Sequence, residues 1–264
     1  AYEIRPSLVG SEMCIRDRLG QLRGGLTWRG KGRMPMETRR NLAEYIDAAV
    51  LAPALSREEA GAQIRTAIDC GCKTVCVMPW LLELAAQMCQ GHATRPSVVL
   101  GFPHGSQETA VKVFEARQLM RFHPAEVDMV NNIGLLRGGQ WDLYEAEIRA
   151  VGEVVHAGGA RLKVILETSQ LTRDEIMDAT RACIRAGADF VKTSTGFTGG
   201  GATEEAAMAM LEAADRRIEV KASGGIRDAD RAAMFLAMGC TRLGVGVGSV
   251  PQIVAGGGVG GDGY

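Results

Sequence analysis

The chain has 264 residues, 46% of them hydrophobic and 23% charged, with 30 basic and 31 acidic side chains. This size suffices for a large core, and the balanced charge argues against nucleic acid as a partner, because nucleic-acid-binding domains carry a basic excess. No stretch approaches the roughly 18 apolar residues of a membrane span, and Glu3 and Arg5 stand where a signal peptide would be apolar. We therefore expect a cytoplasmic protein that does not contact membranes.

Residues 1–40 differ from the rest of the chain in charge and pattern. They carry nine Lys or Arg against four Asp or Glu, a net charge of +5, and they show neither a helical nor a strand period. Residues 7–18 resemble a translated adapter sequence that contaminates assembled environmental data. We predict that 1–40 are disordered or foreign to the natural protein, which we favour over an arginine-rich arm for nucleic acid. Residues 41–252 then form one domain, and 253–264 form a flexible Gly-rich tail.

A strand and helix rhythm follows. Short β-branched runs alternate with longer Ala-rich amphipathic runs about every 25 to 30 residues, which is typical of βα units on a parallel sheet. The pattern predicts eight strands, at 45–51, 73–78, 97–101, 126–132, 162–167, 190–194, 218–222 and 242–247. Eight such units predict a closed (β/α)8 TIM barrel of a single domain. A doubly wound open sheet is the second choice, but no GxGxxG fingerprint follows the first strand.

Helix-end signals lie between the predicted strands. Ser56 with Glu59 and Thr172 with Glu175 match the capping box, in which two side chains satisfy each other's backbone donors at a helix start. Glycines that favour a left-handed helix end precede three strands: Gly71, Gly187 and Gly239.

Cysteines and histidines argue against two other kinds of site. Cys70, Cys72 and Cys76 lie close together, but no second pair or nearby histidine completes a zinc spacing. We expect reduced core thiols and no metal. A hydrolase triad is also disfavoured, because no nucleophile accompanies the four histidines: His92, His104, His123 and His156.

Lysine is scarce, and three of the six lysines lie in consecutive predicted strands, at Lys163, Lys192 and Lys221. Neighbouring strands lie about 5 Å apart, so Lys192 and Lys221 are expected to approach each other inside the barrel. Two positive charges at that distance repel by about 3 kcal/mol at an effective dielectric near 20, enough to lower the pKa of one of them. A neutral lysine can attack a carbonyl and form a Schiff base.

Asp128, in the fourth predicted strand, can accept the protons that Schiff-base chemistry moves, directly or through a water. In the alternative interpretation it only neutralises charge, and the lysines pair with Asp128 and Glu167 in a buried ionic cluster without catalysis. Clustered charge in a barrel core costs stability, which favours a function.

Five segments carry a resemblance to a known family: LGFPHG (100–105), VDMVNNIG (127–134), LKVILETS (162–169), FVKTSTGF (190–197) and VKASGGIR (220–227). Together, over residues 43–250, they resemble deoxyribose-phosphate aldolase, a family of class I aldolases. The resemblance implies a barrel that reversibly joins acetaldehyde to glyceraldehyde 3-phosphate, giving 2-deoxyribose 5-phosphate, with no metal or organic cofactor. The partners it implies are a phosphorylated sugar, aldehydes and a second copy of the chain in a homodimer.

The resemblance also assigns roles. It makes Lys192 the Schiff-base lysine, Lys221 the second lysine that perturbs it, and Asp128 the acid/base partner that works with an ordered water. It implies a substrate-binding set of Cys76, Asp47, Thr195, Gly196, Gly224, Gly225 and Gly246. Within that set Cys76 lines the pocket without being the nucleophile, and the glycines after strands six and seven bind phosphate through backbone N–H groups.

The chain departs from the family pattern at its first and eighth strands. The family commonly reads IDHTLLKP and RIGTSSG, whereas this chain reads IDAAVLAP (46–53) and RLGVGVGS (242–249). Polar groups are therefore absent at Ala48, Ala49, Ala52, Val245, Gly246 and Val247. Each missing hydrogen bond is worth about 1 to 3 kcal/mol, so we expect weaker phosphate recognition. Two alternatives stay open: a related Schiff-base aldolase or lyase for another carbonyl substrate, and an inactive barrel that acts as a binding protein. Tyr264 ends the chain where some members carry a relay tyrosine.

Overall fold

The computed structural model describes residues 42–256, so the predicted segment 1–40, Cys14 and Tyr264 lie outside the described residues. Within the described part, eight parallel strands close into a barrel in chain order. They are β1 (Ile46–Val50), β2 (Thr74–Val77), β3 (Arg95–Leu100), β4 (Glu126–Val130), β5 (Arg161–Ile165), β6 (Phe190–Lys192), β7 (Glu219–Ser223) and β8 (Arg242–Gly246). The predicted single-domain TIM barrel is confirmed, and every predicted strand end falls within two residues of the observed one.

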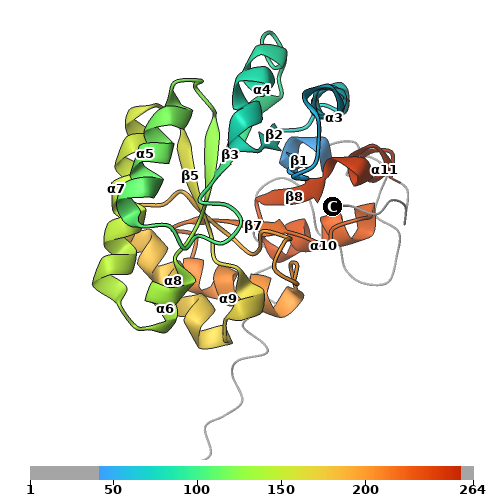
Figure 1. Cartoon of the computed structure of the whole chain (residues 1–264). Helices are drawn as coiled ribbons and strands as arrows, with labels where there is room; N and C mark the ends of the chain where they lie inside the picture. Colours follow the sequence, from blue (N-terminus) through green and yellow to red (C-terminus); the bar gives the residue numbers. More distant parts are fainter. Residues whose placement is uncertain (1–41, 257–264) are drawn as a thin grey trace, which may run out of the picture.

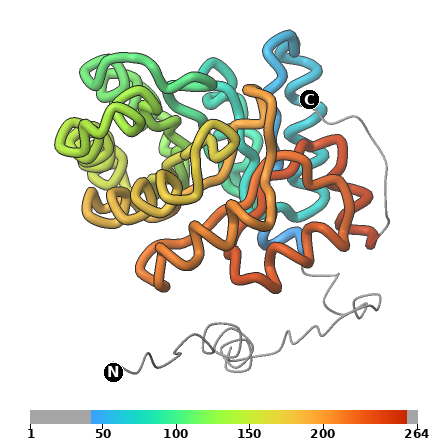
Figure 2. Tube along the Cα trace, turned by 90° about the horizontal axis from the view of Figure 1, so that it is seen from below, coloured from blue at the N-terminus to red at the C-terminus, as the bar shows by residue number. Residues whose placement is uncertain are grey.

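Helices surround the strands on the outside of the barrel (Figure 1). They are α3 (Arg57–Asp69), α4 (Leu82–Met88), α5 (Thr109–Met120), α6 (Ile133–Arg137), α7 (Trp141–Ala157), α8 (Arg173–Ala186), α9 (Glu204–Ala214), α10 (Ala229–Met238) and α11 (Val250–Val254). Short 3₁₀ turns are η1 (Leu42–Tyr45), η2 (Pro79–Leu81), η3 (Thr168–Gln170) and η4 (Val247–Ser249). The chain winds round so that its blue start meets its red end (Figure 2), and β1 pairs with β8.

The predicted helix ends are present. Capping boxes start α3 at Ser56 and α8 at Thr172. In each, the hydroxyl accepts the backbone N–H of the glutamate three residues later, and that glutamate's carboxylate accepts the backbone N–H of the capping residue. Gly187 and Gly239 end α8 and α10 in the left-handed conformation. Gly71, with φ of +70°, directly follows Cys70, the C-cap residue of α3.

The two faces of the strands differ in polarity. Outward side chains such as Val75, Leu162 and Val220 pack with the helices in the main hydrophobic core. Inward positions hold seven buried charged side chains: Asp47, Glu126, Asp128, Lys163, Lys192, Lys221 and Arg242. Because barrel enzymes carry their chemistry at the carboxyl ends of the strands, the inner charges that reach those ends are the candidates for function. No helix between residues 42 and 256 has the length and hydropathy to cross a membrane.

Candidate active site

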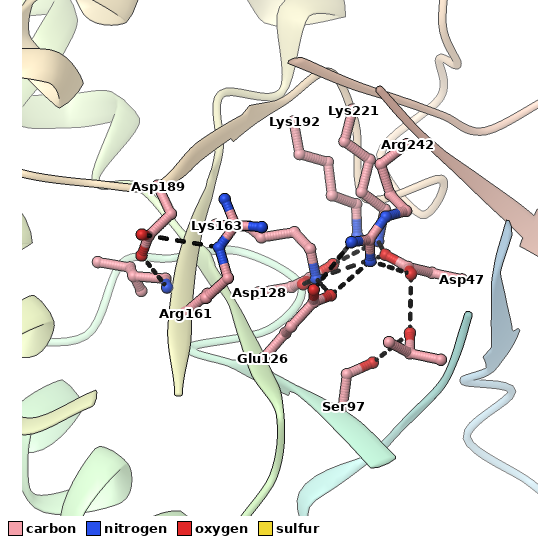
Figure 3. Close-up of polar contacts among 12 residues, drawn as sticks. Asp47, Ser97, Glu126, Asp128, Arg161, Lys163, Asp189, Lys192, Lys221 and Arg242 are labelled. Atoms are coloured by element: carbon pink, nitrogen blue, oxygen red, sulfur yellow. Dashed lines mark hydrogen bonds and ion pairs between the residues drawn. The ribbon is translucent and has the colours of Figure 1, made fainter. Parts of the chain in front are cut away.

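The structure brings Lys192, Lys221 and Asp128 together inside the barrel (Figure 3). Lys192 ends β6, and its register partner on β7 is Lys221. The Nζ atoms of Lys192 and Lys221 both donate to Oδ2 of Asp128, at 3.0 and 2.8 Å. The two lysines therefore share one carboxylate oxygen.

A deeper layer of ion pairs supports this trio. Lys163 donates to Oδ1 of Asp128 at 2.7 Å and lies 2.5 Å from Glu126. Lys221 also donates to Asp47 at 2.5 Å. Arg242 joins the two remaining carboxylates, at 2.7 Å from Asp47 and 2.7 Å from Glu126.

The cluster holds four cationic side chains and three carboxylates, all buried. Lys192 has one ion-pair partner among the described residues, Asp128, and that carboxylate already pairs with Lys163 and Lys221. Deprotonating Lys192 thus balances the buried charge and leaves every carboxylate with a cation. Lys192 is the group of the cluster that can be neutral at the lowest free-energy cost.

The pKa directions agree with this charge balance. Burial, followed by the charge of Lys221, lowers the pKa of Lys192 below its ordinary value against the pull of Asp128. Burial acts on Lys221 too, but the carboxylates of Asp128 and Asp47 outweigh it and raise the pKa of Lys221. Repulsion between the two lysines, the cause inferred from the sequence, therefore contributes but is second to burial.

Asp128 stays ionised. Burial favours its neutral form, but Lys163, Lys221 and Lys192 together hold its pKa well below the usual range. An anion 3.0 Å from Nζ of Lys192 is placed to stabilise a positive iminium nitrogen formed there. The same low pKa makes Asp128 a weak base, so the protonated form of Asp128 is short-lived.

Glu167 is not part of the lysine cluster, so the alternative interpretation, in which the lysines pair with Asp128 and Glu167, holds for Asp128 and is wrong for Glu167. Its Oε2 atom accepts hydrogen bonds from the backbone N–H of Thr195, at 3.2 Å, and from the Thr195 hydroxyl. That hydroxyl also accepts the N–H of Phe197 at 3.1 Å. Thr195, predicted to lie around the substrate, has its only hydroxyl proton committed to Glu167.

Cys76 lies on β2 in a small apolar cluster inside the barrel. The buried members are Ala49, Leu51, Cys76 and Val99, against which Met78, Phe102 and Phe197 pack. Burial, then the negative charge of Asp128, raises the pKa of the Cys76 thiol to about 11. A neutral thiol suits a lining residue. The described residues contain no group of three or more His, Cys, Asp or Glu that is arranged to hold a metal ion.

The predicted phosphate glycines follow neighbouring strands. Gly196 comes after β6, and Gly224 and Gly225 come after β7, with φ of +85°, +88° and +73°. A Cβ on Gly224 would lie 2.9 Å from the Cα of Gly201, so two loops touch backbone to backbone there. A Cβ on Gly225 would meet no atom within 4 Å. Gly246 ends β8, beside them on the rim.

Three of the residues that differ from the family pattern at strands one and eight lie outside the site. Ala48 and Val245 face each other across β1 and β8 and belong to the outer hydrophobic core, as does Val247. Among the strand positions, Ala49 and Gly246 are the ones that lie on the inner face. The expected loss of phosphate contacts therefore rests mainly on Gly246.

Sequence reasoning missed Glu126 and Arg242 and gave Lys163 no role. Glu126 stands two residues before Asp128 on the same inward face of β4, and Arg242 stands opposite Lys221 in the β7–β8 register. Charged residues at alternate positions of strands predicted to be buried were the available signal.

Fold and site together define a class: a (β/α)8 barrel enzyme whose interior holds a buried cluster of lysines and carboxylates. The family model described as DeoC/LacD family aldolase matches residues 42–246. The chain belongs to this family of aldolases.

Relatives and solved structures agree with that assignment. Deoxyribose-phosphate aldolase 1 of Cutibacterium acnes is 42% identical over 208 residues, covering 79% of this chain and 95% of that protein. The deoxyribose-phosphate aldolase of Streptococcus sanguinis is 42% identical, covering 78% of this chain and 93% of its own length. The solved structure of "QR15, an Aldolase" superposes with a TM-score of 0.77 at 36% identity, covering 81% of this chain and 95% of that one.

The absence of a side chain at Gly244 leaves room for Ser223 and for the Lys221 side chain, which yields a prediction. A Cβ there would lie 2.2 Å from Oγ of Ser223 and 3.2 Å from Cε of Lys221. We expect Gly244→Ala to displace Ser223 and with it Lys221, and to lower kcat/KM for aldol cleavage by about 10- to 100-fold, because a shift of about 1 Å in a side chain of an active site costs that much. Steady-state kinetics measures it, with circular dichroism as the check on folding.

Gly248→Ala is the matched control, because a Cβ on Gly248 meets nothing within 4 Å. Equal kinetics for Gly244→Ala and the control would contradict a spacing role for Gly244.

Proposed function

We propose that this chain is a class I aldolase that reversibly cleaves 2-deoxy-D-ribose 5-phosphate to acetaldehyde and D-glyceraldehyde 3-phosphate through a Schiff base on Lys192. The observation that carries the proposal is the charge balance of the cluster, in which Lys192 is the cation without a carboxylate of its own. The names of the relatives from Cutibacterium acnes and Streptococcus sanguinis support the substrate.

In the cleavage direction, neutral Nζ of Lys192 attacks the aldehyde carbon of the open-chain sugar to give a carbinolamine. The carbinolamine takes up one proton and loses water, which leaves an iminium ion. The C3 hydroxyl then gives up its proton, the C2–C3 bond breaks, and its electron pair moves toward the iminium nitrogen. Glyceraldehyde 3-phosphate leaves and an enamine remains. Protonation of the enamine at its terminal carbon restores the iminium, and water releases acetaldehyde and the free lysine.

Asp128 and Lys221 act on charge and protons. Asp128 is the acid/base partner, working through a water, and its anion stabilises the iminium nitrogen at Lys192. Lys221 stays protonated and helps keep the pKa of Lys192 low. Cys76 and Asp47 shape the site, Asp47 by pairing with Lys221 rather than by facing substrate.

The phosphate is bound by backbone N–H groups at Gly196, Gly224, Gly225 and Gly246. Because Gly246 offers no hydroxyl where the family has one, we expect a smaller preference for phosphorylated over plain acceptor aldehydes, by about 10-fold for one lost hydrogen bond. Initial rates with glyceraldehyde 3-phosphate and glyceraldehyde, compared with a family member that carries the serines, measure it. An equal preference in both enzymes would overturn this expectation.

Borohydride reduction in the presence of acetaldehyde tests the proposed function. A stable two-carbon adduct on Lys192, located by peptide mass spectrometry, is the expected product. Absence of an adduct would leave the inactive binding barrel, and an adduct with a ketone but not acetaldehyde would point to a different donor. We also propose a cytoplasmic location and a homodimeric assembly.

A further inference from the structure

The carboxyl end of β5 contains an irregularity beside Lys192. The N–H of Leu166 donates to the carbonyl of Lys192, and the N–H of Thr168 donates to the carbonyl of Thr193, both at 2.9 Å. In a regular parallel ladder, donors two residues apart meet acceptors two residues apart; here the acceptors are consecutive. Glu167 is therefore an extra residue that forms a bulge between the end of β5 at Ile165 and the start of η3 at Thr168, and it adopts φ of 58° and ψ of 61°.

This bulge is costly for the fold. A left-handed conformation is unfavourable for a residue with a side chain, and it persists where the surroundings over-determine it. The Glu167 side chain is fully buried, and its Oε1 atom has no hydrogen-bond partner within residues 42–256. Bulges at barrel rims commonly re-aim a side chain next to an active site.

The re-aimed carboxylate holds the turn that follows Lys192. Oε2 accepts both the N–H and the hydroxyl of Thr195, and the Thr195 hydroxyl in turn accepts the N–H of Phe197. Ser169, two residues after Glu167, packs against Gly200 in the same loop after β6, since a Cβ on Gly200 would lie 2.4 Å from Cβ of Ser169. Gly196, at the rim, lies between the residues so held.

We propose that Glu167 is a positioning residue that fixes Thr195 and Gly196 relative to Lys192. It acts through Thr195, without touching substrate, and sets where the phosphate-bearing part of the sugar is held while Lys192 reacts with the aldehyde end. The inference rests on the proposed function and adds to it a determinant of substrate placement.

The test separates binding from Schiff-base formation. For Glu167→Ala we expect KM for 2-deoxyribose 5-phosphate to rise by at least about tenfold, while borohydride labelling of Lys192 with acetaldehyde stays within about twofold of the unaltered chain. Glu167→Gln keeps an oxygen that accepts both bonds from Thr195, so KM stays within about threefold. Asp215→Ala, at another left-handed residue with φ of 42° at the end of α9, is the matched control and leaves KM unchanged.

A double-variant cycle identifies the route. Glu167→Ala combined with Thr195→Val is expected to raise KM no more than the larger single change, because both remove one coupled unit. Three results would overturn the proposal. The first is a rise in KM of the double variant equal to the product of the two single effects, and the second is an unchanged KM in Glu167→Ala. The third is a loss of Lys192 labelling as large as the rise in KM. If Glu167→Ala does not fold, Thr195→Val carries the comparison: it is expected to raise KM while labelling of Lys192 stays within about twofold, and an unchanged KM would contradict the proposal. Failure of the unaltered chain to label at all would count against the proposed function instead.

Discussion

Methionine in place of Lys192 is expected to lower kcat/KM for cleavage of 2-deoxyribose 5-phosphate by at least about 10⁴-fold, since the variant has no nucleophile for the imine. The fold should survive, because Asp128 keeps its contacts with Lys163 and Lys221 and the cluster then holds three cations and three carboxylates. A coupled assay of glyceraldehyde 3-phosphate release measures the loss, and thermal unfolding checks the fold.

Lys73→Met is the matched control, because Lys73 is exposed and precedes β2 outside the cluster. It should keep full activity and full borohydride labelling. If Lys192→Met retained activity above about one hundredth of the unaltered chain, or if the label moved to another lysine at the original rate, Lys192 would not be the nucleophile.

Replacing Lys221 with methionine is expected to move the acidic limb of the pH–rate profile to higher pH. The neutral form of Lys192 reacts, so the rate rises with pH through the pKa of Lys192. Burial lowers that pKa and the charge of Lys221 lowers it further. Lys221→Met removes the positive charge that lowers the pKa of Lys192. It also removes a cation that shares the Asp128 carboxylate, so Asp128 attracts the Lys192 ammonium more strongly. Both changes raise the pKa of Lys192. At pH 7 a smaller fraction of Lys192 is neutral, and kcat/KM falls by at least about tenfold.

The profile itself discriminates between explanations. Raising the pH should restore part of the activity of Lys221→Met, whereas a loss of geometry lowers the rate equally at every pH. An unchanged midpoint, or one moved to lower pH, would contradict the electrostatic role of Lys221. Lys73→Met again serves as the control and should keep the original midpoint.

The fold was predictable because its signals are local. Each strand is a short β-branched run, and the boxes at Ser56 and Thr172 need only residues three apart. The side-by-side placement of Lys192 and Lys221 also followed from the sequence, since both sit on the inner face of adjacent strands.

The rest of the site depends on contacts that sequence spacing does not encode. Arg242 bonds Asp47 from 195 residues away, across the β1–β8 closure. The backbone of Glu167 is left-handed just after β5 ends, and its carboxylate accepts from Thr195 instead of pairing with a lysine, which no spacing in the sequence indicates. Burial lowers the pKa of Lys192 more than the charge of Lys221 does, and the sequence alone does not show how deeply Lys192 is buried.

Closure of the barrel also completes the surroundings on which the proposed reactivity of Lys192 depends. Asp47, on the first strand, pairs with Lys221 and Arg242 on the last two, so the charge balance around Lys192 is complete only after β8 has docked on β1. Before that, Lys192 lacks the burial and the neighbouring charge that lower its pKa, so we expect it to be mostly protonated at neutral pH and to react slowly with aldehydes. We therefore expect an incompletely folded chain to carry the same amine without the nucleophilicity proposed for it in the closed barrel.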